Sequence, residues 1–328
     1  MITKTAMLYL YVETPLHAGV GSGLSSIDLP IQRERTTQYP MIQGSGIKGK
    51  LRAALEGDRE QLSEEEKAKI DILFGPPTTA TKDSNNDHAG ALIVGDARIL
   101  LFPVRSLNGV FAYTTSYDVL NRFKRDVGRE RADGVFPWVM PHDVDENVAL
   151  VTEEIASAVS TNNTVVLEEF GFQSSPNGQV DKIAEWMATN ALSNPQQDNY
   201  WYNKICDSLV VLPNNDFRDF ALYATEIITR VRIDRTKKTV ERGALWTEEH
   251  LPSDTLLYVP LYATDSRKKA AQDNKNSNGK IPAADILTMA KEVETKQSGY
   301  LQLGGDETVG RGIVRIHMDW QSQPANTK

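Results

Sequence analysis

Residues 15–54 read PLHAGVGSGLSSIDLPIQRERTTQYPMIQGSGIKGKLRAA. They combine a glycine-rich loop, one isolated carboxylate, a basic run and the start of a helix. Apolar side chains recur at helical spacing from residue 45 to about residue 56, which predicts an amphipathic helix there. The small residues 44–46 leave the first backbone N–H groups of this helix free to meet an anion. The stretch is therefore typical of a surface that binds phosphate groups.

Positive side chains surround the start of that helix: Lys48, Lys50 and Arg52. Residues 44–50 satisfy the pattern G-x-x-x-x-G-K, but Leu51 stands where a Ser or Thr must bind magnesium, so we exclude a nucleotide hydrolase. An ordinary helix with a solvated basic face explains the same residues. Both interpretations stay open on these residues alone.

The isolated carboxylate is Asp28, within IDLPIQRE at residues 27–34. Pro30 biases Leu29 toward an extended backbone, so Asp28 is expected on a loop. Arg33 and Arg35 follow, and such cations could hold the phosphates of a polyanion on either side of one acid. A loop Asp is also common as a plain turn-forming or capping residue.

Composition predicts a globular chain, since 40% of the 328 residues are hydrophobic. No apolar run reaches membrane-spanning length, and residues 5–14 alternate as a strand, so we expect a soluble cytoplasmic protein without a membrane partner. The single Cys206 excludes an internal disulfide, and no Cys or His cluster suggests structural zinc.

A net charge of −8 argues against a nucleic-acid partner until its distribution is considered. Residues 29–54 and residues 229–243 each carry a net charge of +4, which leaves −16 for the remainder. Two basic strips on an acidic body could both contact the phosphate backbone of one nucleic-acid strand. The alternative is that both strips are solvated faces.

Patterning along the rest of the chain predicts alternating strands and helices. Helices are expected from the capping box of Ser63 and Glu66 toward residue 74, over 116–127 and 180–191, from a cap at Asn214 or Asn215 to 223, and over 283–293. Strands are expected at 91–104 and 164–170, a long hairpin-like arm at 226–263, and polar loops at 75–90, which we expect to be mobile, and 264–280. Aromatic residues 200–202 are more typical of core than of base stacking.

Near the C-terminus, residues 300–316 read YLQLGGDETVGRGIVRI. Gly304 and Gly305 could let the backbone approach a ligand closely, and Arg311 could pair with phosphate. A glycine-rich hairpin loop needs no ligand, so this signal alone is weak.

These motifs together resemble a known family. His17-Ala18-Gly19, IDLPIQRE followed by T-x-Y-P, and GSGIKGKLR are similar to the backbone subunits of type III-B CRISPR effector (Cmr) complexes, which belong to the RAMP superfamily. The small-residue-Lys-Gly-x-x-Arg element is shared across the superfamily, whereas IDLPIQRE with T-x-Y-P points to this subunit type. The resemblance extends to the C-terminus.

The resemblance implies an α+β fold: a modified ferredoxin-like (RRM-like) palm with an extended thumb hairpin and loop insertions. Residues 1–328 would form this single domain, with the thumb at about 226–263. Aromatic base stacking of the RRM type is not implied, since no RNP1-like sequence is present.

The implied activity is metal-dependent cleavage of target RNA, by attack of a ribose 2′-OH on the adjacent phosphate. The implied cofactor is a divalent cation, Mg or Mn. The implied partners are a CRISPR guide RNA, a complementary target RNA, further copies of the chain in a filament and other subunits of the complex.

By the same resemblance Asp28 matches the cleavage aspartate, as a proton acceptor or as the metal ligand. His17 and Glu248 match secondary contributors, flanked by Trp246 and Glu249. The thumb would contact RNA through a basic tip: Arg235, Lys237 and Lys238.

Two other functions remain open. One is a structural guide-binding scaffold in which Asp28 is only a turn residue. The other is a free-standing CRISPR RNA-processing nuclease that shares the superfamily fold.

Overall fold

The computed structural model describes residues 2–23, 26–77, 88–128, 138–139, 144–153, 160–192, 199–267 and 280–320. Most of the two polar loops expected at 75–90 and 264–280 therefore lies outside the described residues. Within the described part of the chain, no helix has the length and apolar character needed to cross a bilayer.

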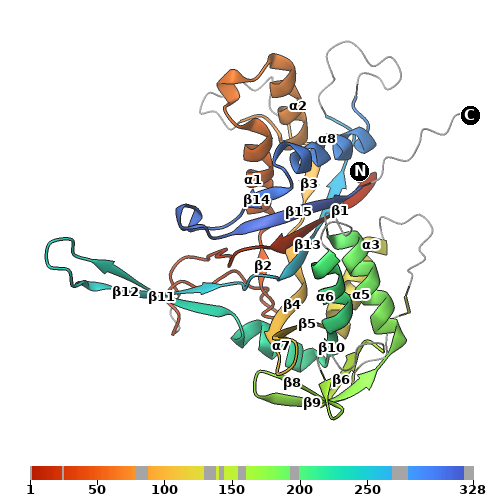
Figure 1. Ribbon diagram of the computed structural model, residues 1–328. Helices are drawn as coiled ribbons and strands as arrows, with labels where there is room; N and C mark the ends of the chain where they lie inside the picture. The colour runs from red at the N-terminus through yellow and green to blue at the C-terminus, as the bar shows by residue number, and fades with distance from the viewer. Residues whose placement is uncertain are drawn as a thin grey trace, which may run out of the picture.

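The described elements form a mixed α+β architecture, as expected (Figure 1). The helices are α1 (Gly44–Glu56), α2 (Glu64–Phe74), α3 (Tyr117–Gly128), α5 (Gly178–Ala191), α6 (Asn199–Ser208), α7 (Asn214–Tyr223) and α8 (Ala283–Lys296), with short 3-10 turns η1 (Arg59–Gln61) and η2 (Glu307–Val309). The strands are β1 (Lys4–Val12), β2 (Met41–Ile42), β3 (Leu92–Val94), β4 (Ala97–Arg105), β5 (Phe111–Ser116), β6 (Val148–Val151), β7 (Ser160–Thr161), β8 (Thr164–Leu167), β9 (Phe170–Pro176), β10 (Leu209–Leu212), β11 (Glu226–Ile233), β12 (Val240–His250), β13 (Leu256–Ala263), β14 (Tyr300–Gln302) and β15 (Ile313–Asp319).

One 13-stranded mixed sheet runs through the body in the order β14-β15-β1-β13-β4-β5-β10-β6-β9-β8-β7, with β2 on β4 and β3 on β13. The four strands β15, β1, β13 and β4 are antiparallel to their neighbours. Tyr9 of β1 lies opposite both Tyr258 and His317, at the centre of this part. Parallel pairs occur only further out among the described strands, between β5 and β10 and between β6 and β9.

Strand β1 is buried on both faces, because its successive side chains point to opposite helical layers. Leu8 packs with residues of α1 and α8, among them Leu51 and Ala290. On the other face, Tyr9 meets Phe123 of α3, with ring centroids 6.3 Å apart. Figure 1 shows α1, α2 and α8 grouped at one end of the body and α3, α5 and α6 at the other. Helices thus cover β1 on both of its faces, and the buried side chains form one hydrophobic cluster.

Helix α1 forms where the apolar spacing predicts it and buries Ile47, Leu51 and Leu55. Gly44 is required at its start, since a Cβ there would lie only 2.5 Å from the carbonyl oxygen of Val94. Helix α2 begins with the expected capping box of Ser63 and Glu66. Both helices confirm the prediction from local sequence.

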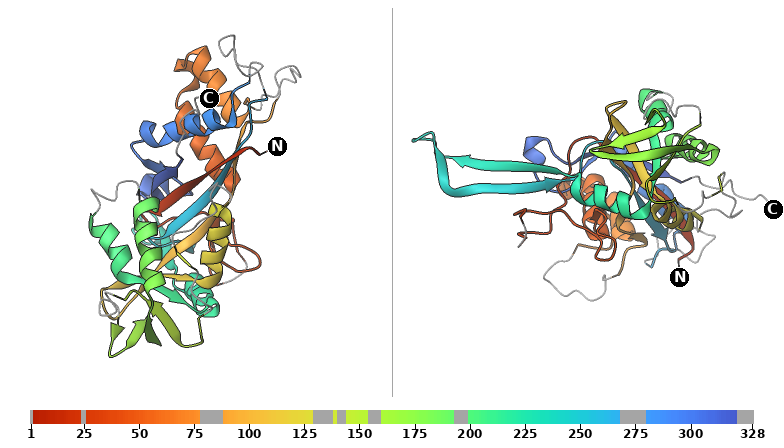
Figure 2. Two further views of the ribbon diagram at one scale, coloured as in Figure 1. Left: turned by 90° about the vertical axis from the view of Figure 1, so that its right-hand side faces the viewer. Right: turned by 90° about the horizontal axis from the view of Figure 1, so that it is seen from below.

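Strands β11 and β12 form a separate two-stranded hairpin that projects from the body (Figures 1 and 2). We call this hairpin the arm. It is shorter than expected, because residues 256–263 form β13, which is buried in the central sheet. The exposed side chains along the arm include large apolar ones: Ile227, Val231, Ile233, Val240 and Leu245.

Two local predictions need correction. The strand expected at 164–170 is broken at Glu168, which has a positive φ of 49°, so β8 and β9 form a hairpin instead. Helix α7 has Pro213 as its N-cap residue, while the Asn214 side chain accepts a hydrogen bond from the backbone N of Asp118. The capping side chain is thus used for a contact between helices.

The expected aromatic core residues lie on α6 and divide between core and solvent. Trp201 and Tyr202 pack against the core, whereas Tyr200 is 69% exposed. The core interpretation is confirmed for two of the three.

Candidate functional site

The loop that carries Asp28 lies alongside β12 at the base of the arm. Leu29 forms an isolated parallel bridge with Glu248. The backbone N of Leu29 donates to the carbonyl of Thr247 at 3.0 Å, and the backbone N of Glu249 donates to the carbonyl of Leu29 at 3.0 Å. The loop is therefore fixed as a short extra strand.

Thr247 also holds the Asp28 side chain. Its backbone N and its hydroxyl donate to Asp28 Oδ2, at 2.8 and 3.0 Å. Asp28 lies on a loop, as predicted, and its carboxylate is exposed. Because the hydrogen bonds from the backbone N and hydroxyl of Thr247 favour the charged form, they lower the pKa of Asp28 below its ordinary value. Asp28 is thus an ionised, positioned carboxylate on the surface.

The side chain of Glu249 points from β12 into the body, where it is the common partner of three residues. It pairs with Arg33, accepts from the backbone N of Ile31 at 3.0 Å and accepts from the Thr225 hydroxyl at 2.8 Å. Arg33 also donates to the carbonyl oxygens of Gln38, Ala221 and Leu222. Arg33 was expected to bind RNA, but these internal contacts argue for a structural role.

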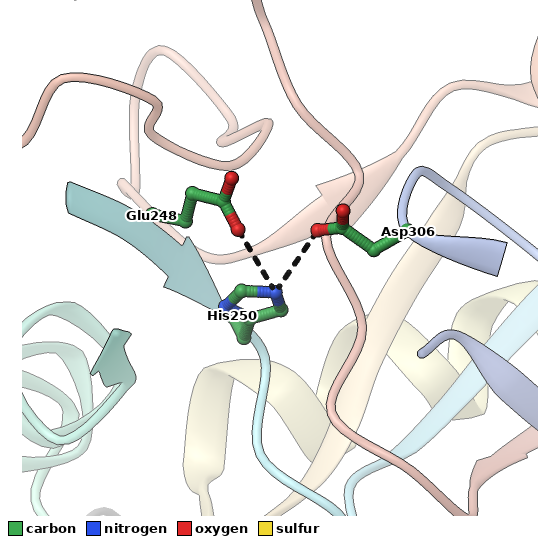
Figure 3. A group of neighbouring side chains, drawn as sticks. All are labelled: Glu248, His250 and Asp306. Atoms are coloured by element: carbon green, nitrogen blue, oxygen red, sulfur yellow. Dashed lines mark ion pairs between the residues drawn. The ribbon is translucent and has the colours of Figure 1, made fainter. Parts of the chain in front are cut away.

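Glu248 lies on the opposite side of β12, as strand alternation requires. Trp246 Nε1 donates to Glu248 Oε1 at 2.7 Å. Arg230 of β11 lies 3.3 Å from Glu248 Oε2 and 3.4 Å from Asp306 Oδ1. Figure 3 shows Glu248 and Asp306 both directed at one ring nitrogen of His250. Glu248 is only 5% exposed, whereas Asp28 is exposed.

His250 is completely buried, and burial lowers its pKa, so the ring is neutral near pH 7. Within the described residues, neither of its ring nitrogens has a hydrogen-bond partner. Its ring faces that of His17, with centroids 5.4 Å apart. His17 Nδ1 donates to the carbonyl of Glu249 at 2.7 Å, which ties the His17 loop to β12.

The glycine-rich segment after β14 packs on the His17 backbone. A Cβ on Gly304, which has a φ of 78°, would collide with the His17 carbonyl oxygen. That oxygen accepts from the backbone N of Gly305 at 2.9 Å. These glycines are therefore explained by a close approach within the chain. Arg311 follows, partly exposed, and its backbone N donates to the carbonyl of Asp306 at 3.2 Å.

The basic residues of α1 differ in how many hydrogen bonds and ion pairs they form within the chain. Arg52 bonds Glu56 and the carbonyl of Gly75, and Lys50 donates to Gln302 Oε1 at 2.8 Å. Lys48 has no hydrogen bond or ion pair to the described residues, and burial lowers its pKa. Of the three, Lys48 is the most available for an anion.

The expected free helix start needs one correction. The backbone N of Gly44 donates to Asp96 Oδ1 at 2.8 Å, so an internal acid caps the first N–H group. Because this N–H group is already bonded, an anion at α1 would bind Lys48 instead of the Gly44 N–H group.

The tip of the arm presents three exposed cations, Arg235, Lys237 and Lys238. Asp234 shapes the turn by accepting hydrogen bonds from the backbone N of Thr236 and of Lys237, at 2.8 and 2.9 Å. The basic tip expected from the sequence is present.

The structure thus gathers His17, Asp28, Trp246 and Glu248 at the base of the arm. Lys48 lies on α1, and the three exposed cations lie at the other end of the arm. Sequence reasoning missed Thr247, His250, Asp306 and Arg230. Alternation along β12 places His250 on the Glu248 side, which was a usable signal. No sequence signal pointed to Asp306, because only the tertiary fold brings it next to His250.

Comparisons with known proteins cover almost the whole chain. The model of the RAMP superfamily matches residues 9–315. The chain is 40% identical over 316 residues to the CRISPR system Cmr endoribonuclease Cmr4 of Pyrococcus furiosus, covering 95% of each protein.

Solved structures of related proteins also match this chain over nearly its whole length. The crystal structure of oligomeric Cmr4 from Pyrococcus furiosus matches with a TM-score of 0.68 and 32% identity, over 98% of this chain and 100% of that one. A chain of the type III-B Cmr-beta complex bound to cognate target RNA matches with a TM-score of 0.65 and 21% identity, over 97% and 98%. The second match shows a shared fold.

Proposed function

The chain belongs to the RAMP superfamily, and from that premise we propose that it is the guide-binding backbone subunit of a type III-B (Cmr) complex and cleaves complementary target RNA. A relative 40% identical over 95% of both chains is named as a Cmr endoribonuclease. One structural observation carries the assignment of cleavage to this chain: Asp28 is exposed and fixed at the base of the arm, while Glu248 and Glu249 beside it are buried.

The partners follow from this assignment. Several copies would line up along one guide RNA, with other subunits of the complex at the ends, and would capture complementary target RNA. The related Pyrococcus protein is described as oligomeric. Such heterologous packing does not close on itself, so the guide and the end subunits would set the copy number.

We infer a modified ferredoxin-like palm for the part of the sheet that carries the site. Its support is the antiparallel order β15-β1-β13-β4, with α1 between β1 and β4 in the chain and α8 between β13 and β15. The strands β5 to β10 would then be an extension of the palm, and the arm would be the thumb.

The proposed reaction is attack of a ribose 2′-OH on the adjacent phosphate. The bond to the 5′ oxygen breaks, leaving a cyclic phosphate and a 5′-OH end. Asp28 would accept the 2′-OH proton or hold a divalent cation, Mg or Mn, which would neutralise charge on the phosphate. One carboxylate fits such an ion, because Mg²⁺ is commonly bound by one or two carboxylates together with substrate phosphates.

The other residues take supporting roles in this proposal. Lys48 and the arm tip would contact RNA phosphates, which positions RNA without reading its bases. His17 would position the site through its bond to the Glu249 carbonyl. Glu248 is buried and bonded to Trp246, so we assign it to holding the base of the arm instead of touching the scissile phosphate.

The test is reconstitution. The expressed protein is combined with a guide RNA and sister subunits, and a labelled matching target is added with Mg²⁺ or Mn²⁺. Regularly spaced cuts in the target support the proposal. Binding without cuts would favour a scaffold, and cutting of guide precursor by the isolated chain would favour a processing nuclease.

A further inference from the structure

We propose that Glu248, His250 and Asp306 form a binding site for a divalent transition-metal ion, such as Mn²⁺, Co²⁺ or Zn²⁺. Each residue offers one ligand atom, and the three atoms lie within 4.8 Å of one another. His250 Nε2 is 3.7 Å from Asp306 Oδ2 and 4.0 Å from Glu248 Oε2 (Figure 3). The site is separate from the exposed carboxylate of Asp28.

Unsatisfied buried atoms point to a ligand here. His250 is completely buried and Glu248 is 5% exposed. Among the described residues, the two ring nitrogens of His250 have no hydrogen-bond partner, and Glu248 Oε2 has none beyond its 3.3 Å ion-pair contact with Arg230. Buried polar atoms are nearly always partnered in folded proteins, so these atoms together need an explanation. A bound cation would satisfy Nε2 and Oε2 at once.

The spacing suits a metal of this class. Metal–nitrogen and metal–oxygen bonds of about 2.0–2.2 Å place tetrahedral ligand atoms roughly 3.4 Å apart. The observed separations of 3.7 and 4.0 Å from His250 Nε2 exceed this by about 0.3 and 0.6 Å, and all three ligand atoms lie within 4.8 Å of one another. Small side-chain rotations would close the difference without moving the strand.

The donor set selects the metal. One imidazole nitrogen and two carboxylate oxygens suit Zn, Co or Mn, whereas Mg²⁺ prefers oxygen ligands in near-ideal octahedral geometry. Three protein ligands also leave at least one position for water or another oxygen ligand.

The positive charge of Arg230 partly offsets the negative charges of Glu248 and Asp306, but its contacts with them are long. Its guanidinium lies 3.3 Å from Glu248 Oε2 and 3.4 Å from Asp306 Oδ1. Charge-assisted hydrogen bonds are usually about 2.7–2.9 Å long, so these contacts are loose. The Asp306 oxygen that faces His250 is Oδ2, the one that Arg230 does not use.

Trp246 provides the outer support that metal ligands usually have. Its Nε1 donates to Glu248 Oε1 at 2.7 Å, which fixes that carboxylate and leaves Oε2 toward His250. Two ligands come from β12 and the third from the loop between β14 and β15. A bound ion would therefore fasten the base of the arm to the body, whether or not the protein cuts RNA.

The test uses the purified full chain, freed of metal by chelator and dialysis, and titrated with Co²⁺. Wild type should bind one equivalent with a visible d–d absorption band and should melt at a higher temperature with Co²⁺ than without. Glu248→Gln and Asp306→Asn should each weaken Co²⁺ binding at least about tenfold and reduce the rise in melting temperature at the same Co²⁺ concentration. Asp306→Asn is the gentler variant, since Asp306 has a φ of 60° and Asn accepts that conformation.

Matched variants make the outcome decisive. Glu307→Gln, which removes the exposed carboxylate next to Asp306 in the chain, should bind Co²⁺ as wild type does. No saturable band and no thermal shift in wild type would overturn the proposal. So would loss of binding in Asp28→Asn with retention in Asp306→Asn, because the ion would then lie at Asp28. If Glu248→Gln fails to fold, Asp306→Asn alone decides. RNA cleavage enters none of these readouts.

Discussion

Thr247 donates two hydrogen bonds to one oxygen of Asp28, from its backbone N at 2.8 Å and from its hydroxyl at 3.0 Å. Asp28 returns a bond, since its backbone N donates to the same hydroxyl at 3.0 Å. The proposed cleavage carboxylate is therefore attached to the base of the arm. A displacement of that base would carry Asp28 with it.

Thr247→Val should shift the pH dependence of cleavage. The change removes the hydroxyl bond that helps to lower the pKa of Asp28, so that pKa should rise toward its ordinary value. The acid limb of the pH–rate profile should move to higher pH. The stabilising effect of ionised Asp28 is present at neutral pH and is lost as pH falls through its lowered pKa. Thr229→Val, across the arm on β11, should leave the profile unchanged.

Arg33→Ala should destabilise the fold. The Arg33 side chain is 12% exposed and its partner Glu249 only 3%, so the change leaves a buried carboxylate without its cation. We expect the free energy of unfolding to fall by about 3 kcal/mol. The exposed Arg35 is the control, and Arg35→Ala should change it by less than about 0.5 kcal/mol. Equal effects of both variants in urea denaturation would contradict the structural role of Arg33.

Lys48→Ala and Arg52→Ala should separate RNA binding from stability. Lys48→Ala should weaken guide binding for every sequence and reduce the salt slope by about 0.7 per lost phosphate contact. Arg52→Ala should instead lower the free energy of unfolding by about 1–2 kcal/mol, because Arg52 bonds Glu56 and Gly75. A wild-type salt slope in the Lys48 variant would remove that residue from the interface.

Shortening the arm should disturb where the target is cut. Val231 and Leu245 already face each other, so replacing residues 232–244 with Asn-Gly should close a two-residue hairpin. The melting temperature should stay close to that of wild type, because the exchanged residues lie outside the central sheet. Mapping of cleavage products should show loss of regular spacing. Cuts at the original positions would show that the arm does not place the scissile phosphates.

Features encoded locally were predictable from the sequence. The apolar spacing of α1 and the capping box of α2 each depend on residues within a few turns, and both appear as expected. The loop position of Asp28 followed from Pro30, which restricts the backbone of Leu29 to an extended conformation.

Partners that are distant in sequence were not predictable. Arg33 and Glu249 are 216 residues apart, and only the alignment of the Asp28 loop with β12 brings them together. For the same reason the sequence did not show that Arg33, within a basic strip, is largely buried against Glu249. The meeting of His250 with Asp306 likewise depends on β12 and the loop after β14 reaching one place, which no periodicity reports.

The most direct measurement compares target RNA bound and target RNA cut by one reconstituted complex, with wild type or Asp28→Ala, in Mg²⁺ or Mn²⁺. Asp28→Ala should assemble and bind target as wild type does, while cleavage falls about a hundredfold or more. Glu65→Ala, which removes an exposed acid at the start of α2, should cut normally. Cleavage by Asp28→Ala at the wild-type rate would contradict the account and leave Asp28 as a turn residue of a scaffold.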